Sequence, residues 1–295
     1  MVDKLNIRVG LDFGLSYTDL FALQSDINGN IMGDPIVRFS RSTNAPIVEK
    51  IKNLFDDAML DYDSIDRLAV TGGRHADLPD YLQGKQIIKI NEITAIGATA
   101  HNAHAQTAAP QWPIVAVSTG TGTACVLVEE NGNATHLGGT AIGGGTLMGL
   151  SSVMLQETDP EKIVALASAG DAAQVNLTIG EAIAGPIGVL PQTATAANFA
   201  KLHRHALDNK NQTMPREHIA AGIVQMVAEA IGRMATEAIL RGSAKKIYIL
   251  GRTITFKPLA HSILEVLSWG NFEVEIVPTP GSGTAKGALI ASQNN

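Results

Sequence analysis

Apolar residues follow two alternating patterns along this chain: short runs typical of strands and longer stretches with a helical repeat. In the first third, strand-like runs cover residues 5–12, 18–24, 36–40, 67–73 and 86–92. Helical spacing covers residues 46–60 and 92–106. An Asn28-Gly29 pair predicts a turn between the second and third strands. The first third of the chain is therefore expected to alternate strands with helices.

The same pattern starts again after residues 107–113, a segment with two prolines that indicates a joint between subdomains. A strand over 113–119 runs into a small-residue loop, and a second strand ends at an Asn131-Gly132 turn. Pro215 precedes a long apolar helix, and Gly242 is expected to stop it. The remaining strands and helices are predicted at 245–252, 256–269, 272–278 and 284–292.

This alternation predicts an α/β fold with parallel or mixed sheets. Each half begins with a strand that ends in small residues and is followed by a hairpin, which indicates a duplicated architecture. Short helices and loops over residues 160–212 interrupt the rhythm of the second half. In such sheets, sites lie where the strands end, so loops that follow strands are expected to converge.

Composition narrows the function classes. With 295 residues, 45% hydrophobic and 17% charged, the chain is long and apolar enough for a large core. A net charge of −6 without a basic tract argues against a nucleic-acid partner. Cys125 is the single cysteine, which fits a reducing cytoplasmic setting. We expect no membrane partner, because no window of about 18 uninterrupted apolar residues occurs.

Three glycine-containing loops follow strands and are candidates for binding phosphate. The first, GLDFGLSYTD at residues 10–19, places Asp12 and Asp19 around small residues and suits a metal-binding carboxylate or an ordinary turn. The second, STGTGTA at 118–124, suits an anion-binding nest or a tight hairpin. The third, GGTAIGGGTLMGL at 138–150, has three adjacent glycines before a helix expected near Thr146. Free N–H groups at that helix start suit a phosphate, and a flexible hinge is the alternative.

Glu92 lies where a strand ends and the next helix begins. A carboxylate there suits a general base that takes a proton from a hydroxyl during phosphoryl transfer. The alternative is a first-turn glutamate that complements the helix dipole. Position alone favours this helix-dipole role over the catalytic one.

The order of these motifs resembles that of type II pantothenate kinases, a family of the acetate-kinase/sugar-kinase/Hsp70/actin superfamily. The resemblance rests on VGLDFGLSYTD, VTGG (70–73), NEITAIG, STGTGT, GGTAIGGGTLMGL, TATAANF (193–199), YILGR (248–252) and GSGTAKGALI (281–290). It implies a two-lobed actin-like, ribonuclease H-like duplicated fold with the active site in a cleft between the lobes. The lobes would cover residues 1–108 and 109–295, with a helical insertion at about 155–212.

The resemblance also implies an activity: transfer of the ATP terminal phosphoryl group to the primary hydroxyl of pantothenate, with Mg²⁺, in coenzyme A biosynthesis. It assigns Glu92 as catalytic base and Asp12 as metal ligand. The residues that it implies for nucleotide binding are Asp12, Gly14, Ser16, Gly120, Thr121, Gly122, Gly143, Gly144 and Gly145. Thr121 would also contact the acceptor. The long helix over 216–241 resembles one that pairs subunits, so a homodimer is expected; burial of that helix within its own domain is the alternative.

Two positions depart from the family pattern. Asp19 stands where the family usually has a lysine, and His136 stands where it has an arginine that grips the substrate carboxylate. A neutral histidine cannot form the bidentate contact of an arginine. We therefore assign His136 and Arg74 to the acceptor region, with Arg252 as a second substitute for the missing arginine. These departures keep two alternatives open: a kinase for another hydroxylated metabolite, and a nucleotide-binding sensor with little catalysis.

Overall fold

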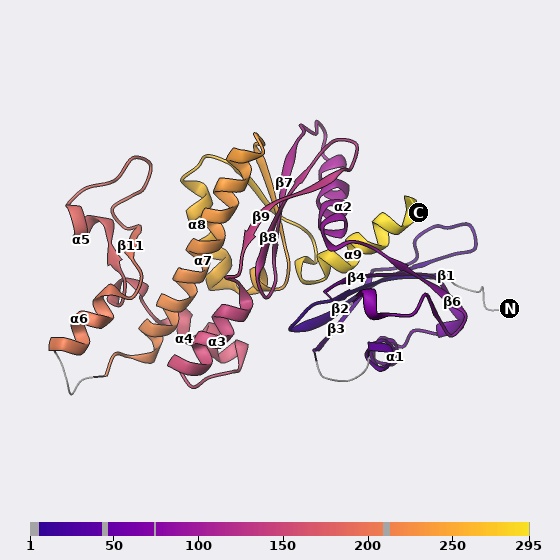
Figure 1. Cartoon of the computed structure of the whole chain (residues 1–295), viewed down its shortest axis with the longest axis horizontal. Coiled ribbons are helices and arrows are strands. Elements are labelled where there is room, and N and C mark those ends of the chain that lie inside the picture. The colour runs from indigo at the N-terminus through magenta and orange to yellow at the C-terminus, as the bar shows by residue number, and fades with distance from the viewer. Residues whose placement is uncertain (1–5, 43–46, 74, 209–212, 295) are drawn as a thin grey trace.

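The computed structural model describes residues 6–42, 47–73, 75–208 and 213–294. Figure 1 shows two lobes side by side, each built around a twisted sheet, with a smaller extension at the end of the second lobe. The first sheet has the order β3-β2-β1-β4-β6-β5. Its strands are β1 (Asn6–Phe13), β2 (Tyr17–Ser25), β3 (Ile36–Arg41), β4 (Ile65–Gly72), β5 (Tyr81–Leu82) and β6 (Lys85–Lys89).

The second sheet has the order β13-β12-β7-β8-β9. Its strands are β7 (Ile114–Thr119), β8 (Thr123–Val128), β9 (Ala134–Thr140), β12 (Lys246–Leu250) and β13 (Glu273–Ile276). Every residue of β7 is buried, as expected for a central strand covered on both faces. The prediction of strands in both halves is confirmed.

The two sheets repeat one topology. In the first, β1 pairs antiparallel with β2, β2 pairs antiparallel with β3, and β1 and β4 run parallel. In the second, β7 pairs antiparallel with β8, β8 pairs antiparallel with β9, and β7 and β12 run parallel. Each sheet has one more parallel strand: β6 pairs with β4 in the first sheet, and β13 pairs with β12 in the second. The duplicated architecture expected from the sequence is therefore present in the sheets, while the boundary of the lobes at residue 108 stays a prediction.

Helices cover both sheets. In the first lobe, α1 (Ile47–Asp57) buries Ile51, Leu54 and Phe55 against one face of the sheet. In the second lobe, α7 (Arg216–Arg241) and α8 (Lys257–Ser268) pack against each other and, with β7 and β12, form the largest apolar core. Two more helices, α3 (Gly144–Met154) and α4 (Pro160–Ala169), pack against α7. The apolar positions that predicted these helices therefore lie on the faces that pack into the core.

Two further helices cross between the lobes. Helix α2 (Glu92–Ala105) follows the first sheet but packs against β7, β8 and β9, and α9 (Gly283–Ala291) follows the second sheet but packs against β1, β2 and β4. The two helices lie against each other between the sheets (Figure 1). Their approach is close: a Cβ atom at Gly287 would lie 1.8 Å from the carbonyl oxygen of Ala95. This seam ties the lobes together and fixes the N-terminus of α2 beside the first sheet.

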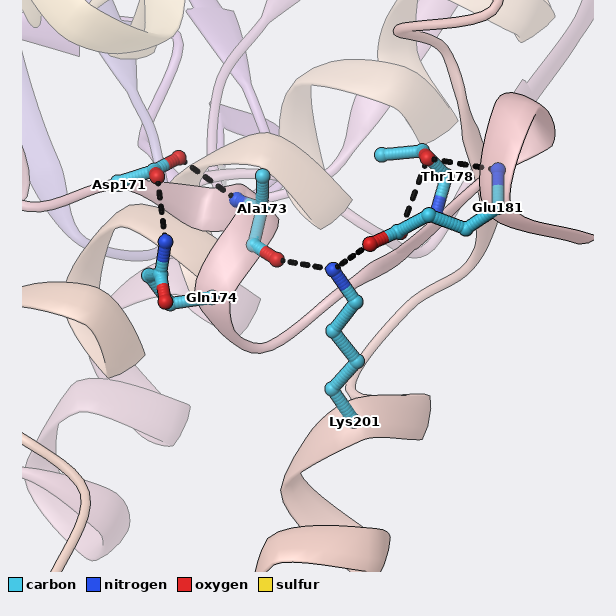
Figure 2. Close-up of polar contacts among 6 residues, drawn as sticks. All are labelled: Asp171, Ala173, Gln174, Thr178, Glu181 and Lys201. Carbon is cyan, nitrogen blue, oxygen red and sulfur yellow. Dashed lines mark hydrogen bonds and ion pairs between the residues drawn. The ribbon is translucent and has the colours of Figure 1, made fainter.

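The extension of the second lobe contains β10 (Leu177–Thr178), α5 (Ile179–Ile183), β11 (Thr195–Ala197) and α6 (Ala200–Asp208), which lie farthest from the first lobe in Figure 1. Polar contacts hold it together (Figure 2). Lys201 of α6 donates to the carbonyl oxygen of Ala173 at 2.7 Å and forms an ion pair with Glu181 of α5. Glu181 and Thr178 form a capping box. The short helices expected in this region are present, together with a two-stranded sheet that the pattern did not predict.

Helix α7 ends where Gly242 was expected to stop it, although the left-handed residue is Ser243. By length and composition alone, α7 is apolar enough to cross a membrane, but more than half of its apolar window is buried inside the fold. Its twelve buried residues face α8, α4 and the second sheet. This is the arrangement of a core helix in a globular lobe.

Candidate active site

A cleft of about 440 Å³ lies between the lobes and draws its walls from both. The first lobe contributes the β1–β2 hairpin, and the first turn of α2 contributes Glu92. The second lobe contributes the β7–β8 hairpin, the start of α3 and the residues that follow β12. The start of α9 closes one side through Thr284. The loops expected to converge therefore meet in one cavity, at the carboxyl ends of β1 and β7.

The β1–β2 hairpin holds Gly14 and Ser16 in the cleft wall. Ser42, just after β3, fixes this loop by two contacts of 2.8 Å: its hydroxyl donates to the carbonyl oxygen of Gly14, and its N–H donates to that of Ser16. Two hydrogen bonds from one residue therefore hold the backbone of this loop. At the tip, the Ser16 hydroxyl lies 2.8 Å from the Thr121 hydroxyl of the opposite lobe. This contact joins the first two predicted phosphate loops across the cleft.

Acidic residues line the floor on the side of the first lobe. Asp12 is the cross-strand partner of Thr71 on β4 and of Asp19 on β2, so the three side chains share one face of the sheet. Burial raises the pKa of Asp12 to about 8, and the nearby negative charges of Asp19 and Glu92 add to the effect. Asp12 Oδ1 is buried and has no hydrogen-bond partner within the described residues. An orphaned carboxylate oxygen at the floor of a cleft suits a cation.

The second and third glycine loops are interlocked. The N–H groups of Gly144 and Gly145 donate to the carbonyl oxygens of Gly120 and Thr121 at 2.8 and 2.9 Å. A Cβ atom at Gly143 would lie 2.7 Å from the Thr121 carbonyl oxygen. Side chains are excluded here because one loop presses its backbone against the other.

This packing corrects one detail of the sequence analysis. Helix α3 begins at Gly144, two residues before the expected start at Thr146, and Gly143 is its N-cap. The N–H groups of Gly144 and Gly145 are occupied by the neighbouring loop, so they are not free donors for a phosphate. Of the three glycines, Gly144 lines the cleft, whereas Gly143 and Gly145 are not among its lining residues.

Glu92 is the first residue of α2 and lines the cleft with an exposed side chain. Asn91 fixes this geometry, because its side chain accepts a hydrogen bond from the N–H of Ile93 at 2.9 Å and so caps the helix. Gly120, Thr121 and Gly122 line the opposite wall. A carboxylate on one side and a glycine loop on the other leave space between them for a phosphoryl group and its acceptor.

Arg252 reaches from the second lobe to the first. It follows β12, and its guanidinium donates to the Asp19 carboxylate on β2. The guanidinium lies over the rings of Phe39 and Tyr17, at 3.8 and 4.8 Å from the ring centroids. Burial raises the pKa of Asp19 to about 6, against the opposing effect of Arg252. A cation therefore lies near Asp19, supplied by the segment that follows β12 in the other lobe.

The structure confirms neither of the two residues assigned to the acceptor carboxylate, His136 and Arg74, as part of the cleft wall. His136 lies exposed on β9 and does not line the cleft. Thr140 is the residue of β9 that reaches the cleft wall, and it lies four positions along the strand from His136, a separation of roughly 13 Å. Arg74 lies outside the described residues, so its role stays a prediction.

Several lining residues were not assigned from the sequence. Tyr17, Thr253 and Phe256 stand in the wall beside Arg252. The Thr253 hydroxyl donates to the Gly120 carbonyl oxygen at 2.8 Å, which fixes the segment after β12 against the second loop. The sequence indicated this segment only in part, because YILGR contains the end of a buried strand, and the other loops of the site also follow strands. The contact between Arg252 and Asp19 joins residues 233 positions apart, so no local pattern indicates it.

Comparison with solved structures supports the two-lobed arrangement. Component A of (R)-2-hydroxyglutaryl-CoA dehydratase from Acidaminococcus fermentans superimposes with a TM-score of 0.63 at 16% identity, covering 98% of both chains. The activator of 2-hydroxyisocaproyl-CoA dehydratase from Clostridium difficile, solved with bound ADPNP, gives 0.60 at 15% identity, covering 98% of this chain and 96% of that one. A ROK family glucokinase from Streptomyces griseus, solved with glucose and AMPPNP, gives 0.53 at 12%, covering 98% and 100%. The expected actin-like fold is confirmed.

Sequence comparison gives a narrower relationship. Type II pantothenate kinase of Oceanobacillus iheyensis is 28% identical over 225 residues, which cover 76% of this chain and 81% of the relative. Type II pantothenate kinase of Bacillus cereus is 26% identical over 228 residues, covering 77% and 81%. The model of the Fumble family matches residues 66–271, a span that includes Glu92, both interlocked glycine loops and Arg252. The chain belongs to the Fumble family.

Proposed function

We propose that this protein is an ATP-dependent kinase that transfers the terminal phosphoryl group to the primary hydroxyl of pantothenate, a step of coenzyme A biosynthesis. The observation that carries the proposal is the position of Glu92, on the cleft wall opposite the glycine loop of the β7–β8 hairpin. The relatives named type II pantothenate kinase and the family membership support the choice of acceptor. The substrates are therefore small molecules.

In this proposal, each wall has a separate task. Glu92 accepts the proton of the acceptor hydroxyl as the new bond to phosphorus forms. The loop over Gly120, Thr121 and Gly122 orients the phosphates with backbone and hydroxyl groups. Ser16 and Thr121, whose hydroxyl groups are in contact across the cleft, hold the two hairpins close together. Positioning and charge neutralisation supply most of the rate enhancement in such transfers.

The residues present fit a magnesium ion. Asp12 offers a buried carboxylate oxygen that has no hydrogen-bond partner among the described residues. Those residues contain no cluster of three or more acidic, histidine or cysteine side chains that could hold a metal by themselves. Mg²⁺ is commonly held by one or two carboxylates together with substrate phosphates and water. When bound, the ion neutralises charge on the phosphates. Asp12 would hold it, and its raised pKa means that the carboxyl must give up a proton first.

The test is ADP release by the purified protein with Mg·ATP, with and without pantothenate. We expect stimulation by pantothenate that falls by about 100-fold or more in Glu92→Gln, since the amide cannot take a proton. Glu265→Gln, on an exposed face of α8, is the matched control and should retain activity. Full pantothenate-stimulated turnover in Glu92→Gln would rule out Glu92 as the base.

A kinase for another hydroxylated metabolite is the second candidate, and the position of His136 favours it. The carboxylate-gripping arginine of the family pattern is replaced by a histidine that does not line the cleft. A screen of hydroxy acids, sugars and alcohols under the same ADP assay separates the two. An acceptor with kcat/KM well above that of pantothenate would favour the second candidate.

We also propose a cytoplasmic homodimer. The buried stripe of α7 is used within its own lobe, so pairing would have to use other surfaces than that stripe. Exposed apolar side chains on the extension, including Ile183, Ile187 and Val189, are available to such a contact. Light scattering that finds monomer at all concentrations would contradict the dimer.

A further inference from the structure

Arg252 is the one positively charged side chain among the described residues that line the cleft. The same walls carry three carboxyl groups, those of Asp12, Asp19 and Glu92, and Asp12 becomes negatively charged when it gives up its proton to hold a metal ion. A triphosphate that enters this cavity adds several more negative charges. A single magnesium ion does not balance that total, so the guanidinium is the protein's own source of compensating charge.

The guanidinium is held with part of its donor set unused. One terminal nitrogen donates to Asp19, whereas Nε is buried and has no hydrogen-bond partner among the described residues. Phe39 and Tyr17 support the plane of the group from the first lobe. An arginine stacked in this way presents a fixed fork that matches the oxygens of a phosphate. A buried donor without an acceptor is costly, which favours a change of partner that turns the guanidinium so that Nε gains an acceptor.

The contacts around Arg252 place it beside the glycine loops that are proposed to bind the phosphates. Its neighbour Thr253 donates to the Gly120 carbonyl oxygen, and a Cβ atom at Gly144 would lie 2.6 Å from the Thr253 hydroxyl. Arg252 therefore extends from the wall formed by the interlocked glycine loops. It also lies close enough to Asp12, the proposed magnesium ligand, to act on its charge.

We propose that Arg252 binds the terminal phosphates of the nucleotide and that Asp19 holds the guanidinium ready when no nucleotide is bound. On binding, phosphate oxygens take over donors of Arg252 that now face Asp19 or have no partner. The ion pair also joins β12 of the second lobe to β2 of the first, so its exchange couples phosphate binding to the spacing of the lobes. The inference rests on the proposed function as a nucleotide-dependent enzyme, but not on the identity of the acceptor.

The test is calorimetric titration of the full chain with Mg·ATP, Mg·ADP and AMP, in the absence of any acceptor. Arg252→Ala should weaken Mg·ATP binding by about 10- to 100-fold and leave AMP within about twofold, because AMP lacks the terminal phosphates. Arg233→Ala is the matched control: this exposed guanidinium lies over the Trp269 ring at 5.8 Å, away from the cleft. It should bind all three nucleotides as the wild type does.

Asp19→Asn tests the exchange itself. It removes the competitor for the guanidinium and one negative charge, so Mg·ATP should bind about 2- to 10-fold more tightly. Weaker binding in this variant would contradict the exchange. If circular dichroism shows that Arg252→Ala does not fold, Arg252→Gln, which keeps most of the stem and a polar head, takes its place with the same expected order of losses.

The proposal is overturned if the three nucleotides lose affinity equally, or if none does. It is also overturned if Arg252→Ala leaves nucleotide binding intact and instead raises the KM for pantothenate, because the guanidinium would then hold the acceptor carboxylate. Nucleotide affinities are measured without acceptor, so a failure of pantothenate as substrate leaves this result readable. Loss of Mg·ATP affinity with retained AMP affinity supports the assignment.

Discussion

The β1–β2 hairpin of the first lobe and the β7–β8 hairpin of the second occupy equivalent places in matching sheets. At the corresponding pair of positions, the first hairpin has Asp12 opposite Asp19, and the second has Ser118 opposite Ala124. All four residues line the cleft. One topology thus presents an acidic pair on one wall and a small, uncharged pair on the other.

The difference shows how a duplicated fold acquires one asymmetric site. Matching sheets bring two hairpins to the same cleft, and the residues then divide the chemistry. The first lobe and the start of α2 supply carboxylates, which we propose hold a metal ion and accept a proton. The second supplies tightly packed glycines, hydroxyl groups and one guanidinium, which suit phosphates. Substitutions that erase this difference should therefore have unequal effects.

The largest expected effect follows removal of the acid from the first hairpin. Asp12→Asn should lower kcat by about 100- to 1,000-fold, because the proposed metal ligand and its charge are lost. Ser118→Ala, the equivalent change in the second hairpin, should lower kcat by less than about tenfold. Steady-state rates of both variants at saturating Mg·ATP measure the contrast. Equal losses would mean that the two hairpins do not divide the chemistry in this way.

The next effect tests the packing of the glycine loops. Gly143→Ala should destabilise the fold by about 1–3 kcal/mol, because the new methyl group would meet backbone atoms of Thr121 and Gly120 at 2.7 and 2.9 Å. Gly149→Ala, in the same helix but facing open space, should stabilise it by about 0.5–1 kcal/mol. Urea denaturation measures both. A Gly143→Ala variant with the same free energy of unfolding as the wild type would show that the loops are not pressed together.

A smaller effect concerns pH and the buried acids. Asp12 and Asp19 have folded-state pKa values of about 8 and 6, both above the ordinary 3.8. Between those limits the folded chain holds protons that the unfolded chain has released, so stability falls as pH rises from about 4 to 8. The slope is at most about 1.4 kcal/mol per pH unit for each group.

Melting curves at several pH values give this slope. Asp12→Asn should show a weaker fall and, at pH 8, a higher melting temperature than the wild type. A wild-type melting temperature that rises steadily from pH 5 to 8, with the same profile in Asp12→Asn, would mean that Asp12 is ionised in the folded state without cost.

The smallest expected effect is at the contact between the hairpins. Ser16→Ala removes the 2.8 Å hydrogen bond to Thr121, which is exposed to solvent, and should cost about 0.5–1 kcal/mol of stability. The KM for ATP should rise only a few-fold. Thr121→Ala should give a similar loss, and the double variant should lose little more than either single one. Fully additive losses would show that the two hydroxyl groups do not interact.

The sequence indicated most of the fold because its apolar periodicity is regular. The buried strand β7 and the amphipathic helix α1 each carry a pattern that follows from burial on known faces. The crossing of α2 and α9 was not visible, because it depends on close backbone approach at Gly287 and on which sheet each helix covers. Long-range packing of this kind leaves no local periodicity.

The site was predicted in the same uneven way. Glycine and acidic residues at strand ends marked Asp12, Gly14 and Thr121 as neighbours of one cleft. The same reasoning did not reveal that the N–H groups of Gly144 and Gly145 are used by the adjacent loop. It also treated Asp19 as a lost cation site, whereas a residue from the other lobe supplies the charge there. Residue type identifies candidate site residues in the sequence, but only the structure shows which of them contact each other across the cleft.

We propose that the acidic and glycine-rich walls together transfer a phosphoryl group to an alcohol. The most direct measurement is phosphorus NMR of the wild-type protein after incubation with Mg·ATP and pantothenate. We expect a phosphomonoester of pantothenate in an amount equal to the ADP formed, and neither product above background in Asp12→Asn. ADP accompanied only by inorganic phosphate, or no ADP at all, would contradict it.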